Sequence, residues 1–241
     1  MELITIIVAI IAIIVINSMM KVNIKKIEEI ALNKQLNNIA KKYPSNKEIC
    51  KTILEKLDNK TTKIEEDNTS NATLYIAIQD KITIGNMYDS FTRIQTIAHE
   101  CLHSIQDRKM LIFNFIFSNI YLLYFFIICI LVIMMELSNT TTILLSNILL
   151  ILSFVYYVVR IFLENDAMIK AEYLAKDYME EYNSACQESS KKQRIISEEE
   201  IKKIAKGFRE VNEGIIKETN CSIFIKIMIK VVIFNVLALI F

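Results

Sequence analysis

Four long apolar runs limit what this chain can fold into more than any other feature. They cover residues 3–20, 110–135, 142–163 and 223–241. About 20 consecutive apolar residues in a helix span the hydrocarbon core of a bilayer. The fourth run contains Lys226 and Lys230, whose long side chains can extend to an interface, so whether this run spans completely stays open. We therefore expect about four transmembrane helices.

The composition favours helices and argues against several classes of protein. The mean hydropathy of +0.35 is too high for an ordinary soluble domain, and the 53% of hydrophobic residues in the 241-residue chain argues against disorder. Three Gly and one Pro are too few for a turn-rich all-β fold or a phosphate-binding loop. A net charge of +1 argues against a nucleic-acid partner, and five cysteines without a CxxC pair argue against a disulfide framework. The expected fold class is a mainly α membrane protein.

The placement of Lys and Arg predicts the orientation in the cell membrane. Basic residues follow the first and third runs, whereas the connection 136–141 contains none. The basic residues that decide this are Lys21, Lys25, Lys26, Arg160, Lys170 and Lys176. Because loops rich in Lys and Arg stay in the cytoplasm, both large polar segments, 21–109 and 164–221, are expected on that side. The first run lacks a basic leader and a cleavage site, which favours a retained anchor.

Both polar segments carry signals of local structure. Residues 21–70 indicate helices that are interrupted at 43–45, followed by a polar loop over 58–70. Alternating apolar residues over 74–78 and 82–85 predict a short β-hairpin. Near the C-terminus, Ser197 and Glu200 have the spacing of a capping box, which marks the start of a helix.

Both histidines of the chain lie in one pentapeptide, His99-Glu100-Cys101-Leu102-His103. On a helix, positions i and i+4 lie on the same face about one turn apart, so two imidazoles at this spacing can bind one metal ion. Glu100 is rotated by about 100°, which lets it reach a water at the metal without being a ligand. Cys101 points away from the ligand face, which favours a buried thiol. A chance match on a structural helix is the competing interpretation, and we favour the metal site.

A catalytic zinc site needs a third protein ligand, and no histidine remains to supply it. The ligand must lie on the same side of the membrane as His99 and His103, and the chain returns there after the third apolar run. Glu164 is the first carboxylate after that run. Glu172 is the alternative ligand, and Asp166 is a candidate supporting group. The residues alone also allow Glu164 to be an ordinary helix-end carboxylate.

The sequence around the two histidines resembles a known family. The segment 97–107, IAHECLHSIQD, is similar to the AHEVGHAIQ core of the YugP-like neutral zinc metallopeptidases of bacterial membranes. Glu164-Asn165-Asp166-Ala167, with Ala171 after it, resembles the EFDASRRA segment of that family, and ISEEE at 196–200 resembles its C-terminal region. The resemblance covers nearly the whole chain. Leu102 stands where the family usually has Gly, and we expect a packing adjustment there.

The resemblance implies one Zn²⁺ per chain, bound by His99, His103 and Glu164, with Glu100 as the catalytic base. The implied function is that of an integral-membrane metallopeptidase, an enzyme with a zincin-like HExxH helix that hydrolyses peptide bonds. Glu100 would assist the attack of a water that zinc activates. For the developing oxyanion the candidates are Tyr173, Tyr178 or an Arg, and the choice stays open. The 74–78 strand can either pair with an extended substrate or only complete a small sheet.

The expected organisation has five parts. These are an N-terminal transmembrane anchor (1–20), a cytoplasmic zinc-peptidase segment with HExxH (21–109), a transmembrane hairpin (110–163), a cytoplasmic segment with the third zinc ligand (164–221) and a C-terminal transmembrane helix (222–241).

The motif lies close in sequence to two apolar runs. His103 precedes the run 110–135 by a few residues, and Glu164 directly follows the run 142–163. We therefore expect the site at the cytoplasmic membrane surface, acting on membrane proteins or on peptides presented there. One alternative function is a catalytically silent zinc-binding scaffold or regulatory subunit. Another is a membrane-disrupting or transport-associated protein in which the motif is accidental.

Overall fold

The computed structural model describes residues 1–87, 90–188 and 196–241 and divides them into two compact units. The helices of the described residues are α1 (Glu2–Met20), α2 (Ile24–Ala31), α3 (Lys34–Ala40), α4 (Asn46–Lys56), α5 (Arg93–Ile105), α6 (Arg108–Met134), α7 (Asn139–Glu188) and α8 (Glu198–Ile240). The strands are β1 (Lys63–Asp67), β2 (Leu74–Ile76) and β3 (Lys81–Gly85). Unit 1 comprises Met1–Val22, Ile112–Phe162 and Lys217–Phe241, and unit 2 comprises Asn23–Leu111 and Leu163–Ile216.

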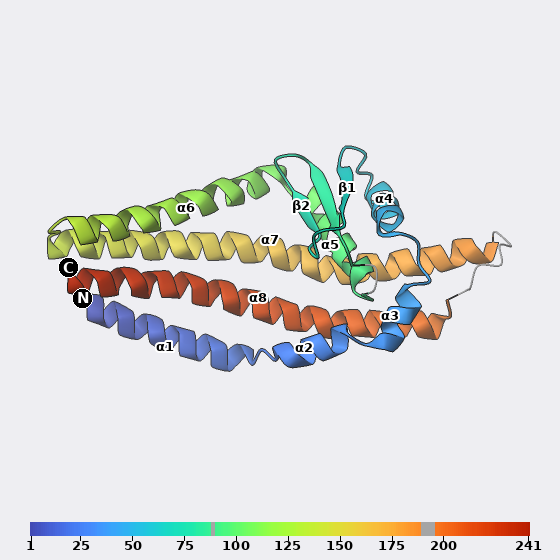
Figure 1. Ribbon diagram of the computed structural model, residues 1–241, viewed down its shortest axis with the longest axis horizontal. Coiled ribbons are helices and arrows are strands. Elements are labelled where there is room, and N and C mark those ends of the chain that lie inside the picture. Colours follow the sequence, from blue (N-terminus) through green and yellow to red (C-terminus); the bar gives the residue numbers. More distant parts are fainter. Residues whose placement is uncertain (88–89, 189–195) are drawn as a thin grey trace. The chain divides into compact units, whose positions relative to one another are not determined.

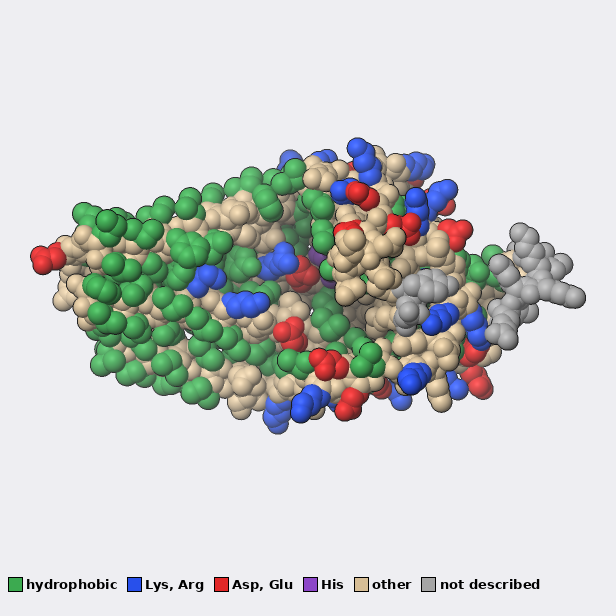
Figure 2. Space-filling view, viewed as in Figure 1, with side chains coloured by type: hydrophobic (Ala, Val, Ile, Leu, Met, Phe, Trp, Pro, Cys, Tyr) green, Lys and Arg blue, Asp and Glu red, His purple; other side chains and the backbone are tan. Residues whose placement is uncertain are grey.

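Unit 1 is helical and strongly apolar. Within the described residues, four helices are long and apolar enough to cross a membrane, and they include α1, α6, α7 and α8. This is compatible with the expected multi-pass membrane protein. The face of unit 1 in Figure 2 carries mainly hydrophobic side chains, as expected for helices whose solvent is lipid.

Polar side chains join the helices inside unit 1. The Asn235 Nδ2 group on α8 donates to Ser146 Oγ on α7 at 2.9 Å. The Tyr121 hydroxyl on α6 lies 3.0 Å from Ser153 Oγ on α7. Hydrogen bonds between small polar side chains hold membrane helices together, because lipid offers these groups no other partner. Small and polar residues inside the apolar runs therefore have a packing role.

The helices α7 and α8 are longer than the sequence analysis indicated. α7 continues from the third apolar run through Glu188, and α8 runs without a break from Glu198 to Ile240. No proline interrupts either helix. Two glycines let the side chains of Leu36 and Ile27 pack closely against α8. A Cβ at Gly207 would lie 2.8 Å from Leu36 Cδ1, and one at Gly214 would lie 2.5 Å from Ile27 Cγ1.

Unit 2 contains a three-stranded sheet in the order β1-β3-β2 (Figure 1). The predicted hairpin is confirmed, because β2 pairs antiparallel to β3 with Tyr75 opposite Ile82. The predicted loop over 58–70 is wrong at its centre, where β1 pairs parallel to β3. The sequence KIEED of β1 has no apolar alternation and four charged residues. Its pairing partner, not its own pattern, makes it a strand.

Helix starts in unit 2 follow the predicted signals. The interruption at 43–45 is confirmed, since Ser45 caps α4 in a capping box with Glu48. The predicted box at the start of α8 is also present: the Ser197 amide donates to Glu200 Oε2 at 2.9 Å, and the Glu200 amide donates to Ser197 Oγ at 3.2 Å. These bonds satisfy backbone donors that a helix start otherwise leaves open.

α5, the helix with the HExxH motif, packs its apolar face into the core of unit 2. Ile94, Ile97 and Cys101 are completely buried, and Leu102 is 7% exposed. Leu102 therefore lies on the buried face of α5. Ile105, the last residue of α5, is 48% exposed.

A buried arginine fixes the start of α5. Arg93 is completely buried, and its guanidinium donates to the carbonyl oxygens of Ala40, Tyr43 and Pro44 at 2.8 to 3.0 Å and to Asn46 Oδ1 at 2.7 Å. These acceptors extend from the last residue of α3 to the first residue of α4. The buried carbonyl groups thus receive hydrogen bonds from the guanidinium instead of from water. The same bonds compensate for burying the charge of Arg93.

Candidate metal centre

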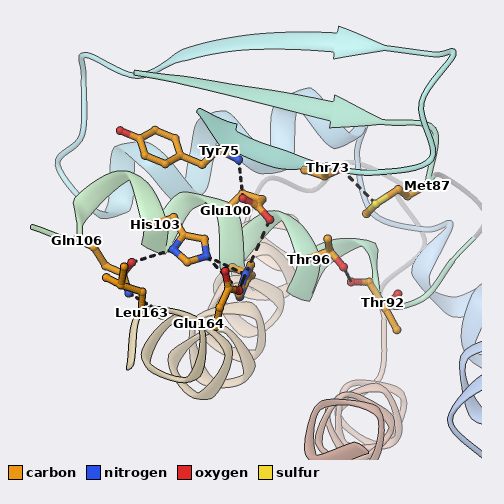
Figure 3. A network of polar contacts seen from close by, with 11 residues as sticks. Thr73, Tyr75, Met87, Thr92, Thr96, Glu100, His103, Gln106, Leu163 and Glu164 are labelled. Carbon is orange, nitrogen blue, oxygen red and sulfur yellow. Dashed lines mark hydrogen bonds and ion pairs between the residues drawn. The ribbon is translucent and has the colours of Figure 1, made fainter. Parts of the chain in front are cut away.

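The two histidines of α5 converge with one carboxylate of α7. His99 Nε2 and His103 Nε2 lie 3.0 Å apart. Glu164 Oε2 lies 3.6 Å from the first nitrogen and 3.7 Å from the second. The rings of His99 and His103 are nearly perpendicular, at 85°. Two residues one turn apart on α5 thus direct the same ring nitrogen toward one oxygen of α7, as Figure 3 shows for His103 and Glu164.

These three atoms fit a metal ion. They lie within 4.8 Å of one another and form a group that could hold one. The nearest point equidistant from three atoms with these separations lies about 2.0 Å from each, close to the length of metal bonds to imidazole nitrogen and carboxylate oxygen. Two nitrogens and one oxygen also form a donor set that zinc accepts at a site with an open fourth position. His99, His103 and Glu164 could therefore hold a metal ion.

Protons and a metal ion would compete for this site. Burial opposes protonation of His103, but the nearby carboxylates of Glu164 and Glu100 outweigh it and raise the pKa of His103. An imidazole must lose its proton from the coordinating nitrogen before it can bind a metal. The same carboxylate that completes the donor set thus makes metal binding sensitive to acid.

Glu100 lies beside the three donors without joining them. Its Oε1 atom is 3.9 Å from His99 Nε2, and its Oε2 atom accepts a 2.6 Å hydrogen bond from the backbone amide of Tyr75 in β2 (Figure 3). Burial raises the pKa of Glu100, and the charges of His99 and His103 partly oppose this rise. One carboxylate oxygen is therefore held by the sheet while the other faces the histidines. A carboxylate placed in this way can take up and return a proton.

The edge of the sheet takes part through its backbone. In an antiparallel pair, the backbone N–H and C=O groups of successive residues point alternately toward the partner strand and away from it. β2 is at the sheet edge, and the Tyr75 amide donates to Glu100 rather than to β3. The sheet thus supports Glu100 through a backbone donor of its edge strand.

Glu172 and Tyr178 make their contacts away from the three donors. Glu172 accepts a 2.9 Å hydrogen bond from Arg209 on α8. Tyr178 is buried and packs against Tyr43 and Tyr182, so it belongs to the core. Tyr173 is 60% exposed. The structure therefore brings Glu164, and not Glu172, to the histidines.

Cys101 is directed into the core, away from the donors. Its Sγ atom lies 3.7 Å from Cys50 Sγ on α4, and both residues are completely buried. The expectation of a buried thiol is confirmed.

Sequence reasoning missed the contribution of Tyr75. Because this residue acts through its backbone amide, no side-chain pattern could have revealed it; only the prediction that strand and motif helix pack together could have suggested it.

The chain was compared with models of protein families, with curated proteins and with solved structures, and none of the three comparisons found a match.

Proposed function

We propose that this protein is an integral-membrane zinc metallopeptidase. The observation that carries the proposal is the convergence of His99 Nε2, His103 Nε2 and Glu164 Oε2, with the Glu100 carboxylate 3.9 Å from the nearer histidine. A site that only stabilised the fold would need the three donors and a fourth ligand, but no acid or base beside them. The resemblance of residues 97–107 and 164–171 to YugP-like metallopeptidases supports the same conclusion.

Glu100 and the Tyr75 amide have different roles in the proposed hydrolysis. A bound Zn²⁺ would polarise the scissile carbonyl and lower the pKa of a water molecule. Glu100 Oε1 would accept the proton of the attacking water and later deliver it to the leaving amine. The Tyr75 amide keeps the other oxygen of Glu100 in place during both transfers. The low exposure of Glu100, 8%, limits competition from bulk solvent.

We further propose that the substrates are membrane proteins or peptides held at the cytoplasmic membrane surface. α5 ends at Ile105 and the span-capable α6 begins at Arg108, so the histidines are tied closely to one span. Glu164 lies in α7, an unbroken helix that also contains the third apolar run. The metal site is thus connected by short lengths of chain to two apolar helices.

The experiment is a cleavage assay with the full chain in lipid bilayers. One peptide sequence is offered in a soluble form and in a lipid-anchored form, before and after treatment with a zinc chelator. The proposal predicts that the anchored form is cleaved faster, that chelation stops cleavage and that added Zn²⁺ restores it. Cleavage that resists chelation would refute the metallopeptidase, and equal rates for both forms would refute the membrane-surface preference.

Removing the Tyr75 amide should lower activity without removing the metal. Tyr75→Pro deletes this N–H, and a proline is tolerated in an edge strand where the N–H points away from the partner. Tyr75→Ala is the matched control, because it loses the same ring and hydroxyl but keeps the amide. A hydrogen bond to a charged group contributes about 1.5–3 kcal/mol, so kcat should fall about tenfold or more in Tyr75→Pro relative to Tyr75→Ala. Equal kcat in the two variants would show that the amide does not support Glu100.

A further inference from the structure

The ring of His103 has a second partner on the side away from Glu164. His103 Nδ1 lies 2.8 Å from Gln106 Oε1. The amide nitrogen of Gln106 donates to the Leu163 carbonyl at 2.9 Å and to Asp166 Oδ2 at 3.1 Å, both on α7. Figure 3 shows Gln106 between His103 and Leu163. One side chain at the end of α5 thus contacts a ligand histidine and the turn of α7 that carries Glu164.

These contacts determine which way the Gln106 amide faces. The Leu163 carbonyl can only accept a hydrogen bond. The Asp166 carboxylate is paired with Lys170 at 2.6 Å, so it also accepts. Two acceptors on one side require the NH₂ group of Gln106 on that side, which leaves its carbonyl oxygen facing His103.

The orientation of the amide in turn determines the tautomer of His103. A carbonyl oxygen cannot donate, so His103 Nδ1 must carry the hydrogen of the 2.8 Å contact. In the neutral ring Nε2 then has a free lone pair, and this is the atom that lies 3.0 Å from His99 Nε2 and 3.7 Å from Glu164 Oε2. A hydrogen bond at one ring nitrogen sets the role of the other.

We propose that Gln106 is the positioning residue of the metal centre. It fixes the Nδ1–H tautomer and the ring plane of His103, and through Leu163 and Asp166 it links α5 to the turn that carries Glu164. The inference rests on the proposed function only where it makes His103 a metal ligand. The tautomer is a property of the metal-free chain and can be measured without any activity.

Two substitutions separate the two parts of this role. Gln106→Leu removes both the acceptor for His103 and the donor to α7. Gln106→Glu keeps an acceptor for His103 but replaces the donor with a charge that faces the Leu163 carbonyl and the Asp166 carboxylate. Lys170→Met is the control, because it removes the partner of Asp166 and leaves every contact of Gln106 in place.

The test is the ¹⁵N spectrum of the full chain in micelles, labelled at histidine, without metal and at alkaline pH where both rings are neutral. The chain has only two imidazoles, and His99→Gln assigns the signals. We expect the Nδ1–H form of His103 in the wild type, in Gln106→Glu and in Lys170→Met, and a mixture of tautomers in Gln106→Leu. An unchanged tautomer in Gln106→Leu would overturn the proposal, as would the Nε2–H form in the wild type.

A second measurement follows zinc affinity by competition with a chelator. Replacing a partner of a ligating histidine typically lowers metal affinity about 10–100-fold, and this loss is expected for Gln106→Leu but not for Lys170→Met. Equal affinity in wild type and Gln106→Leu would contradict the positioning role. If the wild type bound no zinc at all, the metallopeptidase would fail, while the tautomer measurement would still decide the role of Gln106.

Discussion

Glu100→Gln is expected to abolish peptide cleavage while zinc stays bound. Glutamine has nearly the same size, and its side-chain oxygen can still accept the hydrogen bond from the Tyr75 amide. It cannot take up a proton, and general acid–base catalysis typically contributes about 10²–10⁴-fold to the rate. We therefore expect kcat to fall by at least about a hundredfold, measured with the lipid-anchored peptide in bilayers.

The zinc content of the same preparation supplies the control. Glu100 is not one of the three converging donors, so the variant should bind as much zinc as the wild type. Cleavage by Glu100→Gln at the wild-type rate would contradict the role of this residue as base. Absence of cleavage in both proteins, with zinc bound to both, would favour the alternative of a catalytically silent scaffold.

The second large effect is expected at Glu164. Glu164→Gln replaces a charged oxygen ligand with a neutral amide at almost unchanged volume. Removing a group that supports a ligand typically lowers metal affinity about 10–100-fold. Loss of the ligand itself should lower zinc affinity by more than this. Competition with a chelator of known affinity measures this change in the full chain.

Glu172→Gln is the matched control for Glu164→Gln. It makes the same chemical change on the same helix, two turns further along, where Glu172 accepts a hydrogen bond from Arg209. Its zinc affinity should equal that of the wild type. If Glu172→Gln lost zinc and Glu164→Gln retained it, the third ligand would have been assigned to the wrong carboxylate.

Much of the site could be predicted because it depends on short-range geometry. The spacing of His99 and His103 predicts that both face one point as soon as the segment is helical, and the helix α5 fulfils that condition. Glu164 required one further step, namely counting how often the chain crosses a membrane. The structure brings this carboxylate within 3.7 Å of both histidines.

Other features could not be read from the sequence, because they depend on contacts between distant segments. β1 is charged and becomes a strand only through its pairing with β3. Arg93 would be placed at the surface by its charge, yet its guanidinium is buried because it donates to four acceptors between the end of α3 and the start of α4. The Tyr75 amide supports Glu100 through a backbone atom that every residue except proline possesses.

Zinc-edge X-ray absorption on the wild-type chain, purified in micelles from zinc-supplied cells, tests directly whether the three donors bind zinc. We expect one zinc per chain, bound by two imidazole nitrogens and by oxygen, with about 2.0 Å to each ligand atom and no sulfur. A chain that binds no zinc would contradict this expectation. So would zinc bound through sulfur, because Cys101 is buried on the opposite face of α5 from the two histidines.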